Sequence, residues 1–203
     1  MSGECCSSVL TRVPDTLDLL VKRRLWRPYL RRELDQPRRR LVVEAKTLAK
    51  LVGVVHVPTL YLIDGLEITM SYFDGHSLQR MCRDPQPDQR ILHRVGVNLR
   101  TLHDSNIAHG NLLPSHILIR KDCLDPQCDL SRIHAFDSVC IVGWSSSYTT
   151  TLPQDKATDL STLKRCLSNG WKEILAGYSA KSATSTVKKL VGLDALGRKK
   201  PKV

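Results

Sequence analysis

Residues 109–118 read His109-Gly110-Asn111-Leu112-Leu113-Pro114-Ser115-His116-Ile117-Leu118 and are the most informative part of the chain. Its first part is polar and broken by a glycine and a proline. Its end leads into the apolar run 117–119, which is typical of a short buried strand. On the N-terminal side, residues 88–104 carry apolar residues at helical spacing, namely Ile91, Leu92, Val95, Leu99 and Leu102. The stretch therefore reads as a loop between an amphipathic helix and a buried strand.

Downstream of this loop, the chain is expected to be mostly helical. A second short buried strand is predicted at 139–142, after a polar and irregular segment at 121–137. The run of serines, tyrosine and threonines at 145–151 reads as a loop. Helical periodicity returns at 155–168 and again at about 183–194.

Upstream, the pattern is dominated by strands. Two strand-like runs flank Asp64-Gly65, which is the strongest short hairpin signal. A helix is predicted at 37–52, with Asp35 as N-cap and Pro37 in the first turn. An apolar stretch at 17–21 predicts a strand that leads into Lys22. Strands first and helices after indicate an α+β fold.

The joint between the two parts falls at residues 71–76. We therefore divide the chain into a β-rich part at 1–72, a mostly helical part at 73–194 and a basic tail at 195–203.

The net charge of the 203-residue chain is +11, which favours polyanionic partners. The basic residues cluster between 22 and 40 and again in the tail, which contains Arg198, Lys199 and Lys200. Two interpretations stay open: a solvated face with a frayed tail, or a nucleic-acid surface. Few aromatic residues interleave with the charges, so stacking on single strands is not supported.

The cysteines and the apolar runs indicate an intracellular protein that is not embedded in a membrane. Seven cysteines, with no secretory signal at Met1-Ser2-Gly3-Glu4, favour reduced thiols inside a cell. Cys123 and Cys128 are too isolated to predict a zinc site. No apolar run approaches the roughly 18 residues that a membrane-spanning helix needs.

Four ordered motifs carry a resemblance to a known family. Residues 109–118 resemble the catalytic loop H-G-D-L-T-T-S-N-M-I/L of the PRPK family, the small atypical kinase subunits of the KEOPS/EKC complex. Residues 152–160 resemble its L-P-E-D-K-x-V-D-L, and 196–200 its closing R-G-R-K. Lys22 at the end of a strand and Glu44 in the next helix match the kinase lysine and its glutamate.

The resemblance implies a two-lobed protein-kinase-like fold with a small β-rich N-lobe and a reduced, mostly helical C-lobe. It implies ATP and Mg²⁺ as cofactors, Ser/Thr kinase or ATPase activity, and a role in threonylcarbamoyladenosine modification of tRNA. The implied partners are a small subunit on the N-lobe, the tRNA-modifying catalytic subunit on the C-lobe, and tRNA at the basic surface. Cytoplasm and nucleus both suit the family.

By the same resemblance, several site residues are retained. Lys22, Glu44, Met70 and Tyr72 are the expected nucleotide-binding residues, and Asp159 is the expected brace of the catalytic-loop backbone. His109 is expected to be structural rather than a base or a ligand.

The positions that perform the chemistry differ from the family. Asn111 stands where the base aspartate is expected, and losing a general base typically costs about 10²- to 10⁴-fold in rate. His116 replaces the metal-binding asparagine, and Gly143-Trp144-Ser145 replaces D-F-G, so the hard oxygen ligands that Mg²⁺ prefers are missing. A shifted alignment would instead give Asp137 a metal role.

The loop over the phosphates is also degenerate. The chain contains no G-x-G-x-x-G, and a short loop from Cys5 to Ser8 would hold phosphates weakly.

Three functions compete. The first is a pseudokinase-like or weakly ATP-hydrolysing subunit of a KEOPS-type complex. The second is an active atypical Ser/Thr kinase, and the third is a basic nucleic-acid-binding protein unrelated to kinases.

Overall fold

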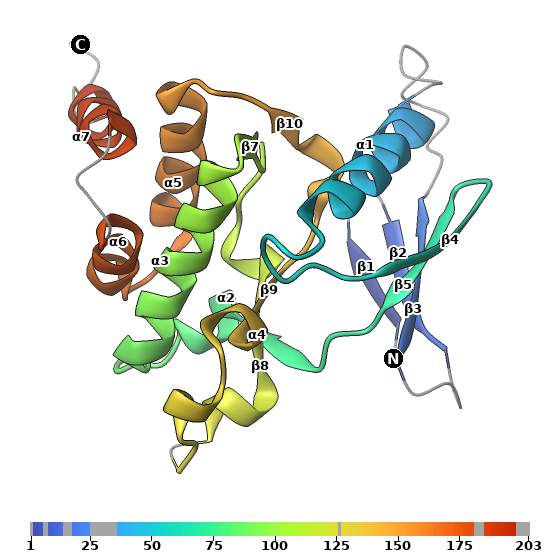
Figure 1. Ribbon diagram of the computed structural model, residues 1–203, viewed down its shortest axis with the longest axis horizontal. Helices are drawn as coiled ribbons and strands as arrows, with labels where there is room; N and C mark the ends of the chain where they lie inside the picture. Colours follow the sequence, from blue (N-terminus) through green and yellow to red (C-terminus); the bar gives the residue numbers. More distant parts are fainter. Residues whose placement is uncertain are drawn as a thin grey trace, which may run out of the picture.

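A computed structural model describes residues 2–5, 8–13, 18–24, 36–125, 127–180 and 185–197. Figure 1 shows an antiparallel sheet with one helix on one side of the molecule and a set of helices on the other side. Within the described residues, no helix is long and apolar enough to cross a membrane. The tail residues Arg198, Lys199 and Lys200 lie outside the described part.

The sheet has five antiparallel strands in the order β1-β2-β3-β5-β4. Their bounds are β1 Ser2–Cys5, β2 Ser8–Arg12, β3 Leu19–Arg24, β4 Leu60–Asp64 and β5 Glu67–Ser71. The predicted hairpin is confirmed, and Gly65 takes the left-handed conformation that its turn requires (φ 54°). Strand β3 confirms the strand that was predicted to lead into Lys22. Strands β1 and β2 precede it and were not predicted.

Helix α1 (Gln36–Leu51) confirms the helix predicted at 37–52. Its residue Leu41 packs with Ile68 and Met70 in a small core beneath the sheet, which is separate from the larger core. Further along the same helix, Leu48 and Leu51 belong to the larger core of the helical part. One helix thus contributes to both cores.

The helical part is built from α2 (Leu78–Met81), α3 (Gln89–Asp104), α5 (Pro153–Cys166), α6 (Trp171–Ser179) and α7 (Ser185–Gly197). The helices predicted at 88–104, 155–168 and 183–194 are confirmed within a few residues. Helix α6 was not predicted, because it has only nine residues and most of them are apolar, which leaves no helical periodicity to detect.

Two glycines allow α3 and α6 to pack closely. A Cβ atom at Gly96 would lie 2.0 Å from the carbonyl oxygen of Ile174, and one at Gly177 would lie 2.0 Å from that of His93. No side chain fits at either position without a shift of the backbone.

Short strands connect these helices to the site. Strands β6 (Gly75–Ser77), β8 (Ile117–Arg120) and β9 (Val139–Ile141) form a sheet in the order β6-β8-β9, and β7 (Ile107–Ala108) pairs with β10 (Tyr148–Thr149). The segment expected to be irregular contains short helical turns, namely η3 (Lys121–Leu124), η4 (Leu130–Arg132) and α4 (Ala135–Ser138). Two further turns are η2 (Pro114–His116) and η5 (Trp144–Ser146).

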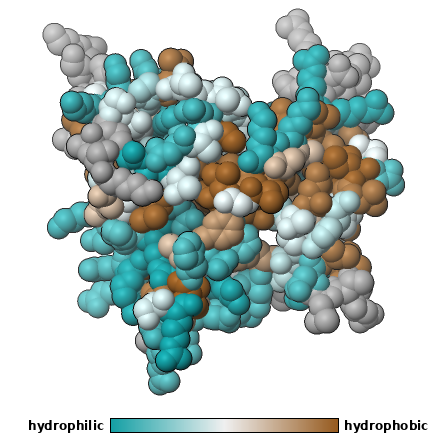
Figure 2. Space-filling view, viewed as in Figure 1, coloured by the Kyte–Doolittle hydropathy of each residue, from teal (hydrophilic) through white to brown (hydrophobic). Residues whose placement is uncertain are grey.

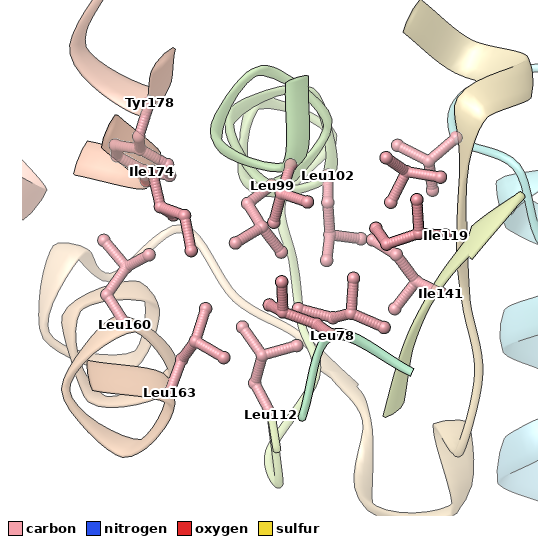
Figure 3. Packing of buried hydrophobic residues seen from close by; sticks show 14 of the residues in the cluster. Leu78, Leu99, Leu102, Leu112, Ile119, Ile141, Leu160, Leu163, Ile174 and Tyr178 are labelled. Atoms are coloured by element: carbon pink, nitrogen blue, oxygen red, sulfur yellow. The ribbon is translucent and has the colours of Figure 1, made fainter. Parts of the chain in front are cut away.

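The main core lies among the helices and the small three-stranded sheet. Figure 3 shows Leu112, in the loop 109–116, pointing into this core near Leu78 and Leu163. Leu112 is fully buried, as are Ile117 and Ile119 on β8. Because each such side chain contributes roughly 1.5–3 kcal/mol when buried, the polar residues between 109 and 116 are held on a well-anchored backbone.

Candidate functional site

The site is assembled from five segments: β3, α1, the loop 109–116, the residues after β9 and α5. Lys22 is on β3, opposite Ile68 in the sheet, and Glu44 is on α1. Lys22 Nζ lies 2.7 Å from Oε1 and 3.0 Å from Oε2 of Glu44. Their side chains are only 11% and 3% exposed. The structure therefore forms the lysine–glutamate pair that the sequence predicted.

Asp159, on α5, holds the backbone of the loop. The amide N–H of His109 donates to its Oδ2 at 2.6 Å, and the amide N–H of Gly110 donates to its Oδ1 at 2.9 Å. Gly110 has a φ of 75°, and a Cβ atom there would lie 2.2 Å from the carbonyl oxygen of Ser146. These contacts are the ones that a backbone brace requires.

The His109 ring is a structural group. Its Nδ1 accepts from the amide N–H of Asn111 at 3.3 Å, so its Nε2 carries the proton and donates to the carbonyl of Val142 at 2.9 Å. The ring also packs against Trp144 with 4.7 Å between ring centroids. Complete burial lowers the pKa of His109 to about 4, with opposing effects from the Val142 carbonyl and the Asp159 charge. Since both nitrogens are engaged and the ring is buried, it has no access to a substrate.

Position 111 carries no carboxylate that could act as a base, and position 116 carries no oxygen ligand for a metal ion. The Asn111 side chain is exposed, while its backbone carbonyl accepts from Nδ1 of the half-buried His116 at 2.9 Å. Burial is the largest cause of the lowered pKa of His116, and the Lys22 charge acts in the same direction. An amide at 111 cannot accept a hydroxyl proton near neutral pH.

The residues do not fit the Mg²⁺ that the family implies. The His116 ring lies directly over Gly143, where a metal-binding carboxylate is expected by resemblance. Imidazole is a poor ligand for Mg²⁺, which prefers hard oxygen donors. Across the part of the chain that the structure describes, no group of three or more His, Cys, Asp or Glu residues could hold a metal ion.

Asp137 does not take the place of the missing carboxylate. It lies on the short helix α4, and its charge acts on His56, which stacks on Phe136 with 5.5 Å between ring centroids. The shifted alignment would require the strand at 139–142 to be abandoned, yet β9 forms there and pairs with β8.

Met70 lies near the end of β5, and Tyr72 directly follows its last residue. Met70 is 4% exposed and packs in the small core under the sheet. The guanidinium of Arg12 lies 4.3 Å from the centre of the Tyr72 ring. Their contact with a nucleotide stays a prediction.

Two contacts that the sequence did not reveal tie α1 to the segment after β9. The hydroxyls of Thr47 and Ser147 are 2.7 Å apart and buried, and Lys50 Nζ donates to Thr149 Oγ1 at 3.3 Å. A run of serines and threonines carries no periodic signal, so nothing in the sequence marked these residues. The helix that carries Glu44 is thereby fixed at a second point.

The comparisons with known proteins agree with this geometry. No family model matches the chain. The chain is 26% identical to "EKC/KEOPS complex subunit bud32" of Dictyostelium discoideum, over 91% of this chain and 76% of that protein. It is 27% identical to "EKC/KEOPS complex subunit Tp53rkb" of Mus musculus, over 91% and 80% respectively. These relatives confirm the resemblance to the kinase subunits of KEOPS/EKC.

Solved structures confirm the protein-kinase-like fold. The Rio2 kinase–ADP/Mg²⁺-phosphoaspartate complex from Chaetomium thermophilum superposes with a TM-score of 0.60 at 16% identity, over 98% of this chain and 71% of that chain. WaaP in complex with acyl carrier protein gives a TM-score of 0.59 at 16% identity, over 96% and 83%. The fold class predicted from the order of strands and helices is correct.

Proposed function

We propose that this chain is the protein-kinase-like subunit of a KEOPS/EKC-type complex, supports threonylcarbamoyladenosine modification of tRNA, and acts there as a scaffold. The relatives named as subunits of that complex support the assignment. A tRNA threonylcarbamoyladenosine biosynthesis protein of Methanocaldococcus jannaschii is also similar, at 25% identity over 80% of this chain and 29% of that protein.

One contrast within the site carries the scaffold assignment. The contacts that hold a kinase fold together are made, since Lys22 pairs with Glu44 and Asp159 holds the loop backbone. The groups that would act on a nucleotide and a hydroxyl are replaced, at Asn111, His116 and Gly143. The chain thus has the contacts that hold the shape but lacks the groups that metal-dependent phosphoryl transfer uses.

Reconstitution tests the proposal. The chain is mixed with the other subunits of the complex from its own organism, and threonylcarbamoyladenosine in tRNA is measured by mass spectrometry of nucleosides. Modification is expected to require the chain and to be unchanged by Asn111→Ala, because the exposed amide performs no chemistry. Asp159→Ala, which releases the loop backbone, is the matched variant expected to reduce it. Modification that is indifferent to the presence of the chain would contradict membership of the complex.

An active atypical Ser/Thr kinase remains the second candidate, because the Lys22–Glu44 pair is the arrangement that active kinases need. It predicts Mg²⁺-dependent turnover that disappears in Lys22→Ala. Turnover that persists in Lys22→Ala would exclude this candidate.

The edge strand β4 is the surface that we propose for a small partner subunit on the N-lobe. Its residues Tyr61, Leu62 and Ile63 are 58%, 58% and 44% exposed, although all three are large and apolar. Figure 2 shows apolar side chains gathered over the sheet, on the right of the view. An apolar edge strand is a template for association, and proteins usually protect it.

Substitution at this edge tests the surface. Tyr61→Ser/Leu62→Ser is expected to weaken capture of the small partner subunit by about tenfold or more, with little change in stability. Val191→Ser, which removes a 64% exposed apolar side chain on α7, is the matched control and is expected to leave capture unchanged. Equal capture by both variants would place the partner elsewhere.

For tRNA, we propose the exposed arginines at 38–40 on α1 together with the basic tail. Phosphate contacts make binding strongly dependent on salt. Replacing these basic residues together with neutral ones is expected to weaken the dependence of tRNA affinity on salt concentration. If the chain were instead a nucleic-acid binder that acts without partner subunits, the same replacement would abolish binding.

A further inference from the structure

His116 and Gly143 lie against each other at the place where the family's metal ligands would stand. A Cβ atom built on Gly143 would lie 3.0 Å from Cδ2, 3.1 Å from Cγ and 3.2 Å from Nε2 of His116. Non-bonded carbon atoms are normally about 3.5–4.0 Å apart. Any side chain at position 143 therefore requires the imidazole to move.

The imidazole is held in its place from two sides. Its Nδ1 donates to the backbone carbonyl of Asn111 at 2.9 Å, which fixes the orientation of the ring. One face stacks on the His109 ring, with 5.4 Å between centroids and 23° between planes. The His109 ring cannot shift, because it is fully buried and donates a hydrogen bond to the carbonyl of Val142. Moving the His116 ring thus costs a hydrogen bond and a stacking contact.

We propose that His116 and Gly143 are an interdependent pair, in which the imidazole occupies the space of the family's metal-binding carboxylate and closes the metal side of the site. The two replacements are then one packing solution rather than two independent losses. It follows that Gly143→Asp alone cannot restore a carboxylate at the family's position, whereas a shorter residue at 116 makes room for it. The inference concerns packing alone, so its failure would leave the proposed function untouched.

A double-mutant cycle on thermal unfolding isolates this pair. The variants are Gly143→Ala, His116→Ala and the two combined. Gly143 has a φ of 88°, so an alanine there is strained whatever its neighbour is, and that cost cancels in the cycle. Gly53→Ala is the matched control, because Gly53 has a φ of 76° and nothing within 4 Å of its built Cβ atom.

The expected result is coupling between positions 143 and 116 only. Gly143→Ala should lower Tm by about 3–10 °C in the chain with His116. The loss should be smaller by more than about 2 °C when residue 116 is alanine, whereas the loss from Gly53→Ala should be the same in both backgrounds. A difference for Gly143→Ala of less than about 2 °C would overturn the proposal.

A folding failure is also decisive. If Gly143→Ala has no cooperative transition, its recovery in His116→Ala/Gly143→Ala supports the pair. Failure of the combined variant to fold, while His116→Ala and Gly53→Ala both fold, contradicts it.

Discussion

The Lys22–Glu44 pair joins the sheet to helix α1 through two almost completely buried charges. Burying a charge is tolerated only when a partner compensates for it, so each residue makes the other necessary. A second ion pair, which joins β3 to β5, is much more exposed to solvent. Arg23 Nε lies 2.6 Å from Glu67 Oε1, but these side chains are 65% and 36% exposed.

Removal of one member of the buried pair is therefore expected to be costly. Glu44→Ala should reduce the free energy of unfolding by about 3–5 kcal/mol, because it leaves the Lys22 ammonium buried and unpaired. Glu67→Ala should cost about 1 kcal/mol or less, as is typical of an exposed pair. Urea unfolding of the two variants gives the comparison, and similar losses for both would show that the buried pair is not special.

His109 makes stability depend on pH. Its pKa falls from about 6.5 in the unfolded chain to about 4 in the folded one, so the folded state disfavours the charged ring. The stabilisation is complete above the unfolded pKa and is lost as pH falls from about 6.5 to 4, which amounts to roughly 3 kcal/mol. His109→Gln should flatten the decline across this window, because an amide does not titrate. Parallel pH–stability curves for the two proteins would contradict this explanation.

Among the elements, helices α3 and α6 cross in close contact at Gly96 and Gly177. Gly96 and Gly177 each face a backbone carbonyl of the other helix at a distance that admits no side chain. Because backbone atoms cannot rotate away as side chains can, an added methyl group must push the helices apart.

The glycines at this crossing should tolerate no substitution. Gly96→Ala or Gly177→Ala is expected to cost about 2–3 kcal/mol or more, in spite of alanine's higher helix propensity. Gly192→Ala on α7 is the control, since nothing lies within 4 Å of its built Cβ atom. That change should stabilise the chain by about 0.5–1 kcal/mol. Thermal unfolding decides the matter, and a gain in Tm for all three would show that the crossing is looser than described.

Elements with a strong local signal could be predicted from sequence. The hairpin at Asp64-Gly65 and the amphipathic helix α3 follow from turn chemistry and periodicity. Strand β1 and helix α6 could not be predicted, because one has no apolar alternation and the other is apolar over most of its short length. Their pairing is determined by tertiary contacts.

The candidate site shows the same division. The resemblance to the kinase family was sufficient to predict that Lys22 and Glu44 meet and that Asp159 lies at the loop. The hydroxyl contact between Thr47 and Ser147 joins residues 100 positions apart that belong to no motif. The packing of His116 on Gly143 likewise depends on side-chain directions that no spacing rule contains.

At the scale of the whole molecule, the chain keeps the architecture of a kinase and closes its metal site. The two cores share helix α1, and the loop 109–116 is anchored in the larger one. Every contact described at the site stabilises a shape, and the exposed Asn111 carries an amide where a base is expected by resemblance. The chain is therefore expected to be a kinase-like scaffold whose stability does not depend on Mg²⁺.

The most direct test is the thermal unfolding of the full chain with ATP, measured with Mg²⁺ and with EDTA. A chain without a metal site should have the same Tm in both, whether or not ATP itself raises the Tm through Lys22. A ligand at about 100 times its Kd stabilises a fold by roughly 2.7 kcal/mol, which corresponds to several degrees and is readily measured. A Tm that rises with Mg²⁺ only in the presence of ATP would reveal a working metal site and contradict a scaffold that is independent of Mg²⁺.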